Sequence, residues 1–291
     1  MMVTVFTPTY NRAYIINKLY LSLLSQTDKD FEWVVVDDGS TDSTQEYFAT
    51  LAKTEHAFAI KYVKQENGGK HRAINRGVQL AKGEIFFIVD SDDCLTSDAI
   101  EKIKRWFGTL DTTKKFAGVA GLRGYSSNRV IGGCGNESEY YLDAKNTQRK
   151  KYNLLGDKAE AYFTEILRAY PFPEFDGEKF VTEEVVWNAV AKHGYYLRWF
   201  NEIIYICDYL EDGLTKSGAA KYVNNPQGTL YWAQQQLAIF SDFKVRMKTI
   251  FTYYTAVRAK KKKREIAMDL GIHTCSVNLA VLLAKLKRVK L

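Results

Sequence analysis

Three aspartates occupy four consecutive positions directly after a run of apolar residues. The stretch reads Phe86, Phe87, Ile88, Val89, Asp90, Ser91, Asp92, Asp93. Carboxylates gathered at the end of a strand repel one another, and burying them without partners is costly. Mg²⁺ or Mn²⁺ relieves such repulsion, and both ions prefer oxygen ligands together with phosphate. The stretch therefore predicts a site for Mn²⁺ or Mg²⁺, with a solvated acidic turn that caps the next helix as the alternative.

The elements that must position these carboxylates alternate between strand and helix over the first hundred residues. Apolar, β-branched runs predict strands at 3–7, within 33–40, where the run ends in turn residues, and at 60–65 and 85–90, and the segments between them have helical spacing. This alternation predicts a mainly parallel, Rossmann-like α/β sheet with helices on both faces. In such sheets ligands bind beyond the carboxyl ends of the strands. Two of these ends are acidic, at Asp37–Asp38 and at Asp90–Asp93, and we expect them to converge.

The second half of the chain is less regular. Residues 118–135 are rich in glycine and are predicted to form a loop, and 158–170 are predicted to form a helix. A further helix is expected from Thr182 to Gly194, followed by two short strands. We predict a catalytic domain at 1–225, with a nucleotide-binding half at 1–105 and an acceptor half at 106–225. A helical, basic C-terminal extension is expected at 226–291.

Charge is distributed unevenly along the chain. The net charge is +7, yet residues 258–291 contain ten Lys or Arg and two Asp or Glu, whereas the rest has 31 and 32. The body is therefore close to neutral, and the composition does not predict a nucleic-acid partner. The four cysteines are scattered without C-x-x-C spacing, which argues against a zinc site or a disulfide framework. We expect a cytoplasmic protein without a signal peptide or membrane-spanning helix.

Four stretches occur in a characteristic order and resemble the family 2 glycosyltransferases with a GT-A fold, of the bacterial capsule and surface-polysaccharide type. These stretches are FTPTYNR, FEWVVVDDGSTDST, NGGKHRAINRGVQLAKGE and FFIVDSDD. The resemblance implies a nucleotide-diphospho-sugar donor, a UDP-sugar, and a nucleotide-sugar-binding site in the first hundred residues. It implies that Asp38 accepts a hydrogen bond from the uracil ring, that Asp90 contacts ribose or sugar, and that Asp92 holds the metal. The further nucleotide-site residues that it implies are Thr7, Pro8, Thr9, Tyr10 and Lys70.

The resemblance also implies a general base near the start of a helix about 90 residues after the acidic stretch. Glu184 in FVTEEVVW occupies the place of the family's aspartate, and Glu183 precedes it. A glutamate there departs from the family pattern by one methylene group. The alternative is that both acids stabilise the first helical turn through the helix macrodipole. Nearby, Glu178 is expected either to contact sugar or to cap a helix, and Tyr209–Thr215 resembles a loop that closes over the donor.

The C-terminal tail combines a basic run with an apolar helical face. Residues 258–264 read RAKKKKR, and Leu279, Leu282, Leu283, Leu286 and Val289 share one face of the helix that follows. This pattern is typical of a helix that lies in an anionic membrane interface. A peripheral position on the inner face of the cell membrane is therefore one prediction. A helix packed on the body, with a solvated basic face, is the other.

These observations predict an inverting, metal-dependent glycosyltransferase with a saccharide or lipid-linked saccharide acceptor. A nucleotidyltransferase would also place paired aspartates on a doubly wound sheet, but it would need a basic triphosphate-binding loop near the N-terminus. A nucleotide-sugar-binding module without catalytic activity would retain Asp38 and Asp92 and would not need Glu184.

Overall fold

The computed structural model describes residues 1–135, 138–208 and 218–286, and the chain divides into two compact units. The sheet unit comprises Met1–Pro171 and Val186–Leu210. The helical unit comprises Phe172–Val185 and Glu211–Leu291. The segment 172–185 thus belongs with the C-terminal helices, although residues of the sheet unit follow it in the chain.

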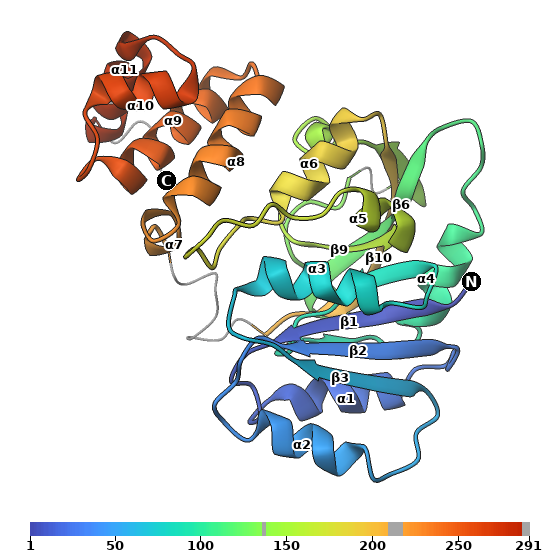
Figure 1. Ribbon diagram of the computed structural model, residues 1–291. Helices are drawn as coiled ribbons and strands as arrows, with labels where there is room; N and C mark the ends of the chain where they lie inside the picture. Colours follow the sequence, from blue (N-terminus) through green and yellow to red (C-terminus); the bar gives the residue numbers. More distant parts are fainter. Residues whose placement is uncertain (136–137, 209–217, 287–291) are drawn as a thin grey trace. The chain divides into compact units, whose positions relative to one another are not determined.

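The sheet unit is built on one mixed sheet (Figure 1). The elements in chain order up to the last strand are β1 (Val3–Thr9), α1 (Ile16–Leu24), β2 (Phe31–Asp37), α2 (Thr44–Leu51), β3 (Ala59–Lys64), α3 (Lys70–Leu80), β4 (Ile85–Ile88), β5 (Cys94–Leu95), α4 (Ala99–Phe107), β6 (Phe116–Ser126), β7 (Arg129–Val130), β8 (Tyr141–Ala144), the 3₁₀ helix η1 (Asn146–Gln148), β9 (Lys158–Phe163), α5 (Thr164–Ala169), α6 (Glu184–Lys192) and β10 (Tyr196–Ile206). The strand order is β3-β2-β1-β4-β9-β6-β10-β5, with β7 beside β6 and β8 beside β10. The predicted α/β fold class is confirmed.

The parallel part of the sheet is the part that the first hundred residues predict. Strand β1 pairs in parallel with β2 and β4, and β2 pairs in parallel with β3. The later part adds antiparallel pairs, because β9 runs against both β4 and β6. Strand β6 is therefore again parallel to β4, and its carboxyl end lies at the same edge of the sheet as Asp90.

Three element predictions in the second half are wrong. The glycine-rich stretch expected as a loop forms β6 and β7, and the helix expected at 158–170 is divided into β9 and the short α5. The two strands expected after Gly194 are one continuous strand, β10. These differences matter for function, because β6 and β10 deliver side chains to the acidic turn.

Both faces of the sheet are covered, which explains the uninterrupted apolar runs in β1 and β2. On one face Trp33 packs in a buried cluster with Leu19 of α1, Phe48 of α2 and Trp106 of α4. On the other face α3 lies so close that a Cβ atom at Gly77 would stand 2.1 Å from the ring of Phe6. Strands β1 and β2, which end at the acidic edge, are thus held between two layers of helix.

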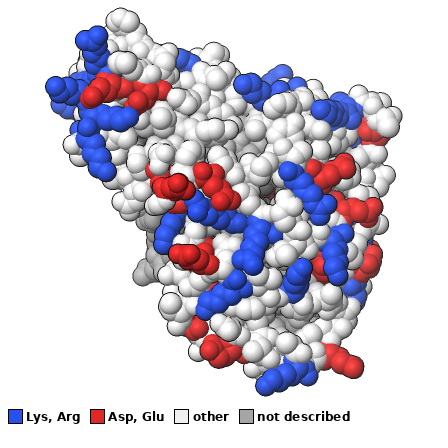
Figure 2. Space-filling view, viewed as in Figure 1, with Lys and Arg blue, Asp and Glu red and all other residues white. Residues whose placement is uncertain are grey.

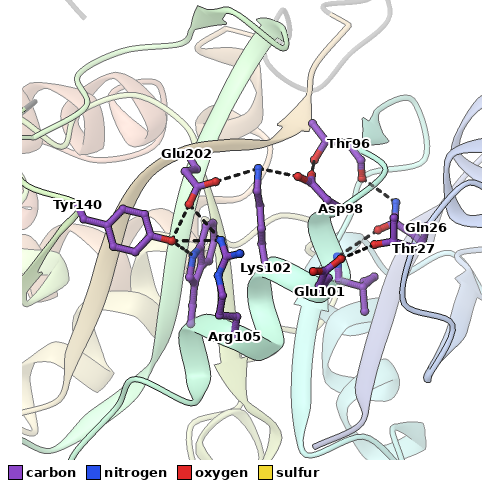
Figure 3. A network of polar contacts seen from close by, with 11 residues as sticks. Gln26, Thr27, Thr96, Asp98, Glu101, Lys102, Arg105, Tyr140 and Glu202 are labelled. Carbon is purple, nitrogen blue, oxygen red and sulfur yellow. Dashed lines mark hydrogen bonds and ion pairs between the residues drawn. The ribbon is translucent and has the colours of Figure 1, made fainter.

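A polar network fixes the segment that follows the acidic turn (Figure 3). Lys102 of α4 bridges Asp98 and Glu202 at 2.9 Å each, and Glu202 also accepts a hydrogen bond from the hydroxyl of Tyr140 at 2.7 Å. At the start of the same helix, Gln26 donates to the carbonyl oxygen of Thr96 at 2.8 Å. The network ties α4 to β10 and to the end of α1.

Among the described residues after β10 there are five helices, which are α7 (Ala220–Val223), α8 (Pro226–Ile239), α9 (Phe243–Val257), α10 (Lys263–Leu270) and α11 (Thr274–Lys285). The core of the helical unit is formed by buried side chains of α8–α11, among them Ile250, Tyr253, Ile266 and Val277. Among the described residues, no single helix is both long and apolar enough to cross a membrane. The pair α10 and α11 meets that test only jointly and is bent by 111°.

Candidate functional site

One chain of hydrogen bonds and ion pairs connects the carboxyl ends of three strands. The carbonyl oxygen of Thr9, the last residue of β1, accepts the backbone N–H of Asp38 at 2.8 Å. Asp38 follows β2 and accepts the N–H of Gly69 at 2.7 Å, and the next residue, Lys70, pairs with Asp90 beyond β4 at 2.6 Å. The predicted convergence of the two acidic strand ends is therefore present in the structure.

Asp38 anchors the loop that precedes α3. Its carboxylate oxygens accept four hydrogen bonds, two each, from Gln65 and Gly68 on Oδ1 and from Asn67 and Gly69 on Oδ2, at 2.7–3.2 Å. A carboxylate has about four lone-pair sites, so these donors occupy its capacity. A uracil N–H at Asp38, as predicted, would have to displace or share one of these donors.

Asp90 lies between two cations. Lys70 Nζ is 2.6 Å from Oδ1, and an Arg123 guanidinium nitrogen is 3.6 Å from Oδ2. Burial disfavours the charged form of Asp90, but the two cations outweigh this effect and hold the pKa of Asp90 below its ordinary value. Lys70 stands at the first position of α3, where the left-handed backbone of Gly69 (φ 95°) turns the loop into the helix. Asp90 is therefore ionised and compensated within the protein.

The other two aspartates of the turn have different surroundings. Burial and the nearby charge of Asp90 raise the pKa of Asp92, whose side chain is partly exposed. Asp93 is buried, and both of its oxygens are engaged, by the hydroxyl of Tyr205 at 2.8 Å and the backbone N–H of Asp208 at 2.9 Å. Burial and the charge of Asp90 raise the pKa of Asp93 to about 7, although these two hydrogen bonds oppose the increase.

The donor set fits a hard divalent cation that binds mainly through its substrate. In the described part of the chain, no group of three or more His, Cys, Asp or Glu side chains is arranged to hold a metal ion. Asp93 accepts hydrogen bonds from an N–H and an O–H group, and Asp90 pairs with the side chains of Lys70 and Arg123. Asp92 is therefore the carboxylate of the turn best suited to a metal cation. Mg²⁺ typically binds proteins through one or two carboxylates and completes its shell with waters and phosphates.

The remaining nucleotide-site candidates surround the end of β1. Thr7 is fully buried, and its hydroxyl accepts the indole N–H of Trp33 at 2.9 Å, which gives it a packing role. Thr9 is buried at the strand end, and its Oγ1 has no hydrogen-bond partner among the described residues. Pro8 is also buried, whereas 47% of Tyr10 is exposed. Of these four, Thr9 and Tyr10 have polar groups that a ligand could use.

The predicted catalytic acids lie at the start of α6. Glu184 is the first residue of the helix and accepts the indole N–H of Trp232 on Oε2 at 3.1 Å. The ring of Trp232 lies 5.8 Å from that of Tyr222, whose pKa is raised by burial and by the charge of Glu184. Glu183 lies in the turn just before the helix. Glu184 thus has an aromatic surrounding within the helical unit.

Glu178 has a structural role. It is buried, and its two oxygens accept the backbone N–H groups of Gln227 and Gly228 at 2.7 and 2.8 Å. These amides belong to the first turn of α8, whose orphan donors favour a carboxylate. The helix-cap alternative is therefore confirmed for Glu178. The loop Tyr209–Thr215 lies outside the described residues.

Several residues of the site carry no local signal in the sequence. Tyr205 contacts the acidic turn from a position 115 residues after Asp90, and Arg123 reaches it from β6, which was predicted to be a loop. Trp232 is 48 residues from Glu184. Only the folded sheet and helices bring these side chains to their partners.

The sheet order, the covered faces and the acidic carboxyl edge define a GT-A type α/β fold. Solved structures that are similar to this chain include the two that follow. One is Staphylococcus aureus TarS 1–349 in complex with UDP-GlcNAc, with a TM-score of 0.65, 17% identity and coverage of 99% of this chain and 93% of that one. The other is the mannosyltransferase PcManGT from Pyrobaculum calidifontis with GDP-Man and Mn²⁺, with a TM-score of 0.57, 20% identity and coverage of 98% and 86%.

Sequence comparison leads to the family. The model of glycosyl transferase family 2 matches residues 4–156, and the chain belongs to this family. Similar proteins include glycosyltransferase GlyA of Streptococcus pneumoniae, 38% identical over 35% of this chain, and chondroitin synthase of Escherichia coli, 34% identical over 46%. The putative teichuronic acid biosynthesis glycosyltransferase TuaG of Bacillus subtilis is 34% identical over 35%. The matches span only 14%, 18% and 40% of the lengths of these three relatives.

Proposed function

We propose that this chain transfers a sugar, with inversion, from a UDP-sugar to a saccharide or lipid-linked saccharide during the synthesis of a surface polysaccharide. The observation that carries the proposal is the connected path from Thr9 through Asp38 and Lys70 to Asp90 at the carboxyl edge of the sheet. Family membership supports the reaction class. The UDP-GlcNAc complex of TarS and the name of TuaG support the donor and the product class.

The residues of the sheet unit have defined roles in this proposal. Thr9, Tyr10 and the loop held by Asp38 bind the nucleoside, and Lys70 and Asp90 contact the region between ribose and diphosphate. Asp92 is the residue that would hold Mn²⁺ or Mg²⁺, which would neutralise the charge that develops on the departing nucleoside diphosphate. The preorganised cation pair around Asp90 keeps this region electrostatically balanced before the donor binds.

Glu184 is the proposed general base. The acceptor hydroxyl oxygen attacks the anomeric carbon, the bond from that carbon to the phosphate oxygen breaks, and the bond electrons leave with the nucleoside diphosphate. The hydroxyl proton passes to the carboxylate of Glu184. The indole of Trp232 donates to Oε2 of Glu184, so Oε1 is the oxygen that we assign as the proton acceptor.

A direct test combines activity with binding. A panel of nucleotide sugars is screened for Mn²⁺-dependent hydrolysis, and UDP binding is measured calorimetrically with and without Mn²⁺. We expect one UDP-sugar to be hydrolysed and Asp92→Asn to lose the Mn²⁺-dependent part of UDP binding while melting normally. Equal calorimetric affinity for wild type and Asp92→Asn would contradict the metal assignment. Pyrophosphate release from a nucleoside triphosphate would instead support nucleotidyl transfer, which family membership does not favour.

A second part of the proposal concerns the surface of α10 and α11. Met268, Leu282 and Leu286 are exposed there, beside the basic run 258–264. In Figure 2, Lys and Arg side chains gather around acidic ones over these two helices. The leucine face is only partly available, because Leu283 packs against the core. Val289 lies outside the described residues. We propose that this surface binds an anionic membrane, because it combines exposed apolar side chains with positive charge.

Point substitutions test the membrane surface best, since truncation before Arg258 would remove Ile266 and Val277 from the core. Co-sedimentation with vesicles containing phosphatidylglycerol should fall at least about tenfold for Leu282→Ser/Leu286→Ser, because burying one leucine contributes about 1.5–3 kcal/mol. Leu21→Ser, at an equally exposed leucine of α1, should bind like wild type. If wild type stays in the supernatant, the surface does not bind membranes.

A further inference from the structure

The hydroxyl group of one tyrosine is hydrogen-bonded to residues on both sides of Asp92 in the sequence. Tyr205 of β10 is fully buried, and its hydroxyl oxygen accepts the backbone N–H of Asp90 at 2.9 Å. The same hydroxyl donates to Oδ2 of Asp93 at 2.8 Å. Asp90 and Asp93 also close the turn between them, because the N–H of Asp93 donates to the carbonyl oxygen of Asp90 at 3.2 Å. Asp92 is therefore a central residue of a β-turn whose two ends share one tyrosine.

The tyrosine is itself held firmly. The guanidinium of Arg123 lies over its ring at 4.0 Å, and Arg123 donates from Nε to the carbonyl oxygen of Lys158 at 2.8 Å. Arg123 also pairs with Asp90, so the ring and the carboxylate share one cation. Burial raises the pKa of Tyr205 well above its usual value, and the phenol stays protonated as a donor.

Other partners extend the arrangement to the end of β10. The second oxygen of Asp93 accepts the backbone N–H of Asp208, and the carboxylate of Asp208 pairs with Lys18 of α1. Removing the tyrosine hydroxyl would therefore leave a buried N–H at Asp90 and a buried oxygen at Asp93 without this partner. Both losses would fall within two residues of Asp92.

We infer that Tyr205 is a positioning residue, which holds the Asp90–Asp93 turn in the conformation in which Asp92 and the donor diphosphate share a divalent cation. This inference rests on the proposed function. Tyr205 acts through the turn and is not itself assigned a contact with substrate or metal. Groups that orient a metal ligand from outside its shell commonly change metal affinity or activity by about 10–100-fold.

The test uses Tyr205→Phe, which keeps the ring under Arg123 and removes only the hydroxyl. Tyr253→Phe is the matched control, because Tyr253 is equally buried and donates to Asp269 at 2.6 Å within the helical unit. Free Mn²⁺ is measured by electron paramagnetic resonance during titration of the protein in saturating UDP, and UDP binding without metal is measured by calorimetry. We expect Mn²⁺ affinity to fall about tenfold or more in Tyr205→Phe alone, with metal-free UDP binding unchanged.

A second variant guards against a folding defect. Asp93→Asn should weaken Mn²⁺ binding in the same direction, and the double variant with Tyr205→Phe should lose no more than Tyr205→Phe does, because the hydroxyl carries the coupling. Full additivity of the two losses, or equal Mn²⁺ affinity in wild type and Tyr205→Phe, would overturn the inference alone. A wild-type protein that binds no Mn²⁺ in the presence of UDP would overturn the proposed function as well.

Discussion

In the sheet unit, Asp38 receives four hydrogen bonds from the loop before α3, whereas Asp92 is partly exposed and has a raised pKa. The helical unit shows the same contrast. Glu178 accepts two backbone N–H groups at the start of α8, whereas Glu184 accepts one indole N–H. In each unit, one carboxylate stabilises the backbone around the site and a second remains suited to a ligand. The number of donors that the fold directs at a carboxylate separates the two roles.

The largest expected effect separates the two glutamates of the helical unit. Glu184→Gln should reduce transfer by about 10²–10⁴-fold, the usual contribution of general-base catalysis, with donor binding and melting temperature unchanged. Glu178→Gln should mainly lower stability, because an amide group would face one of the two N–H donors of α8. The measurements are initial rates with the identified UDP-sugar and thermal unfolding of both variants.

Glu183→Gln is the control for this prediction, since it makes the same chemical change one residue earlier. We expect it to remain active. An inactive Glu183→Gln together with an active Glu184→Gln would show that the general base is Glu183 and not Glu184.

The parallel half of the fold follows from the sequence because each strand there is a local apolar run with turn residues after it. The expectation that the carboxyl ends of the parallel strands converge correctly predicted that Asp38 and Asp90 lie at one edge of the sheet. The second half of the fold could not be predicted from the sequence in this way, because β6 contains glycines that indicate a loop. Their role appears only in the packed sheet, where a Cβ atom at Gly118 would stand 2.0 Å from the carbonyl oxygen of Ala161. Close approach between strands, and not a turn, requires glycine there.

Strand β9 shows the same limit for propensity. Its sequence, KAEAYF, is rich in helix-forming residues, yet pairing with β4 on one side and β6 on the other makes it a strand. The partners of the site residues were also beyond local patterns, as Tyr205 contacts Asp90 across 115 positions. Sequence spacing located the acids of the site, but the donors directed at each acid depend on tertiary structure.

An intermediate effect separates the two aspartates of the sheet unit. Asp38→Asn should reduce the free energy of unfolding by about 1.5–3 kcal/mol, because hydrogen bonds to a charged acceptor are lost and an amide N–H would face other donors. Asp92→Asn should change it by less than about 0.5 kcal/mol, because the Asp92 side chain is partly exposed and substitutions of surface side chains usually have small effects. Denaturant unfolding measures both. A larger loss for Asp92→Asn than for Asp38→Asn would reverse the roles that the hydrogen bonds assign.

The last expected effect, which develops only above about pH 8, concerns the buried cation Lys158. Its Nζ donates to the carbonyl oxygens of Leu155, Asp157 and Ile131 at 3.0–3.4 Å, in place of a carboxylate partner. Burial, together with the charge of Arg149, lowers the pKa of Lys158 to about 8, although Glu160 and Asp157 oppose the decrease. In the unfolded chain a lysine side chain has a pKa of about 10.4.

The sign of the pH dependence follows from these two pKa values. Below pH 8 the lysine is protonated in both states, and the folded protein bears the full cost of the buried charge. Between about pH 8 and 10.4 the unfolded chain binds more protons than the folded one, so stability should rise with pH by up to about 1.4 kcal/mol per unit. Lys158→Met removes this titration while it fills a similar volume. The difference in unfolding free energy between wild type and Lys158→Met, measured from pH 7 to 9.5, should therefore shift in favour of wild type above pH 8. A difference that is constant across this range would show that Lys158 keeps an ordinary pKa and that its three carbonyl partners stabilise the charged form fully.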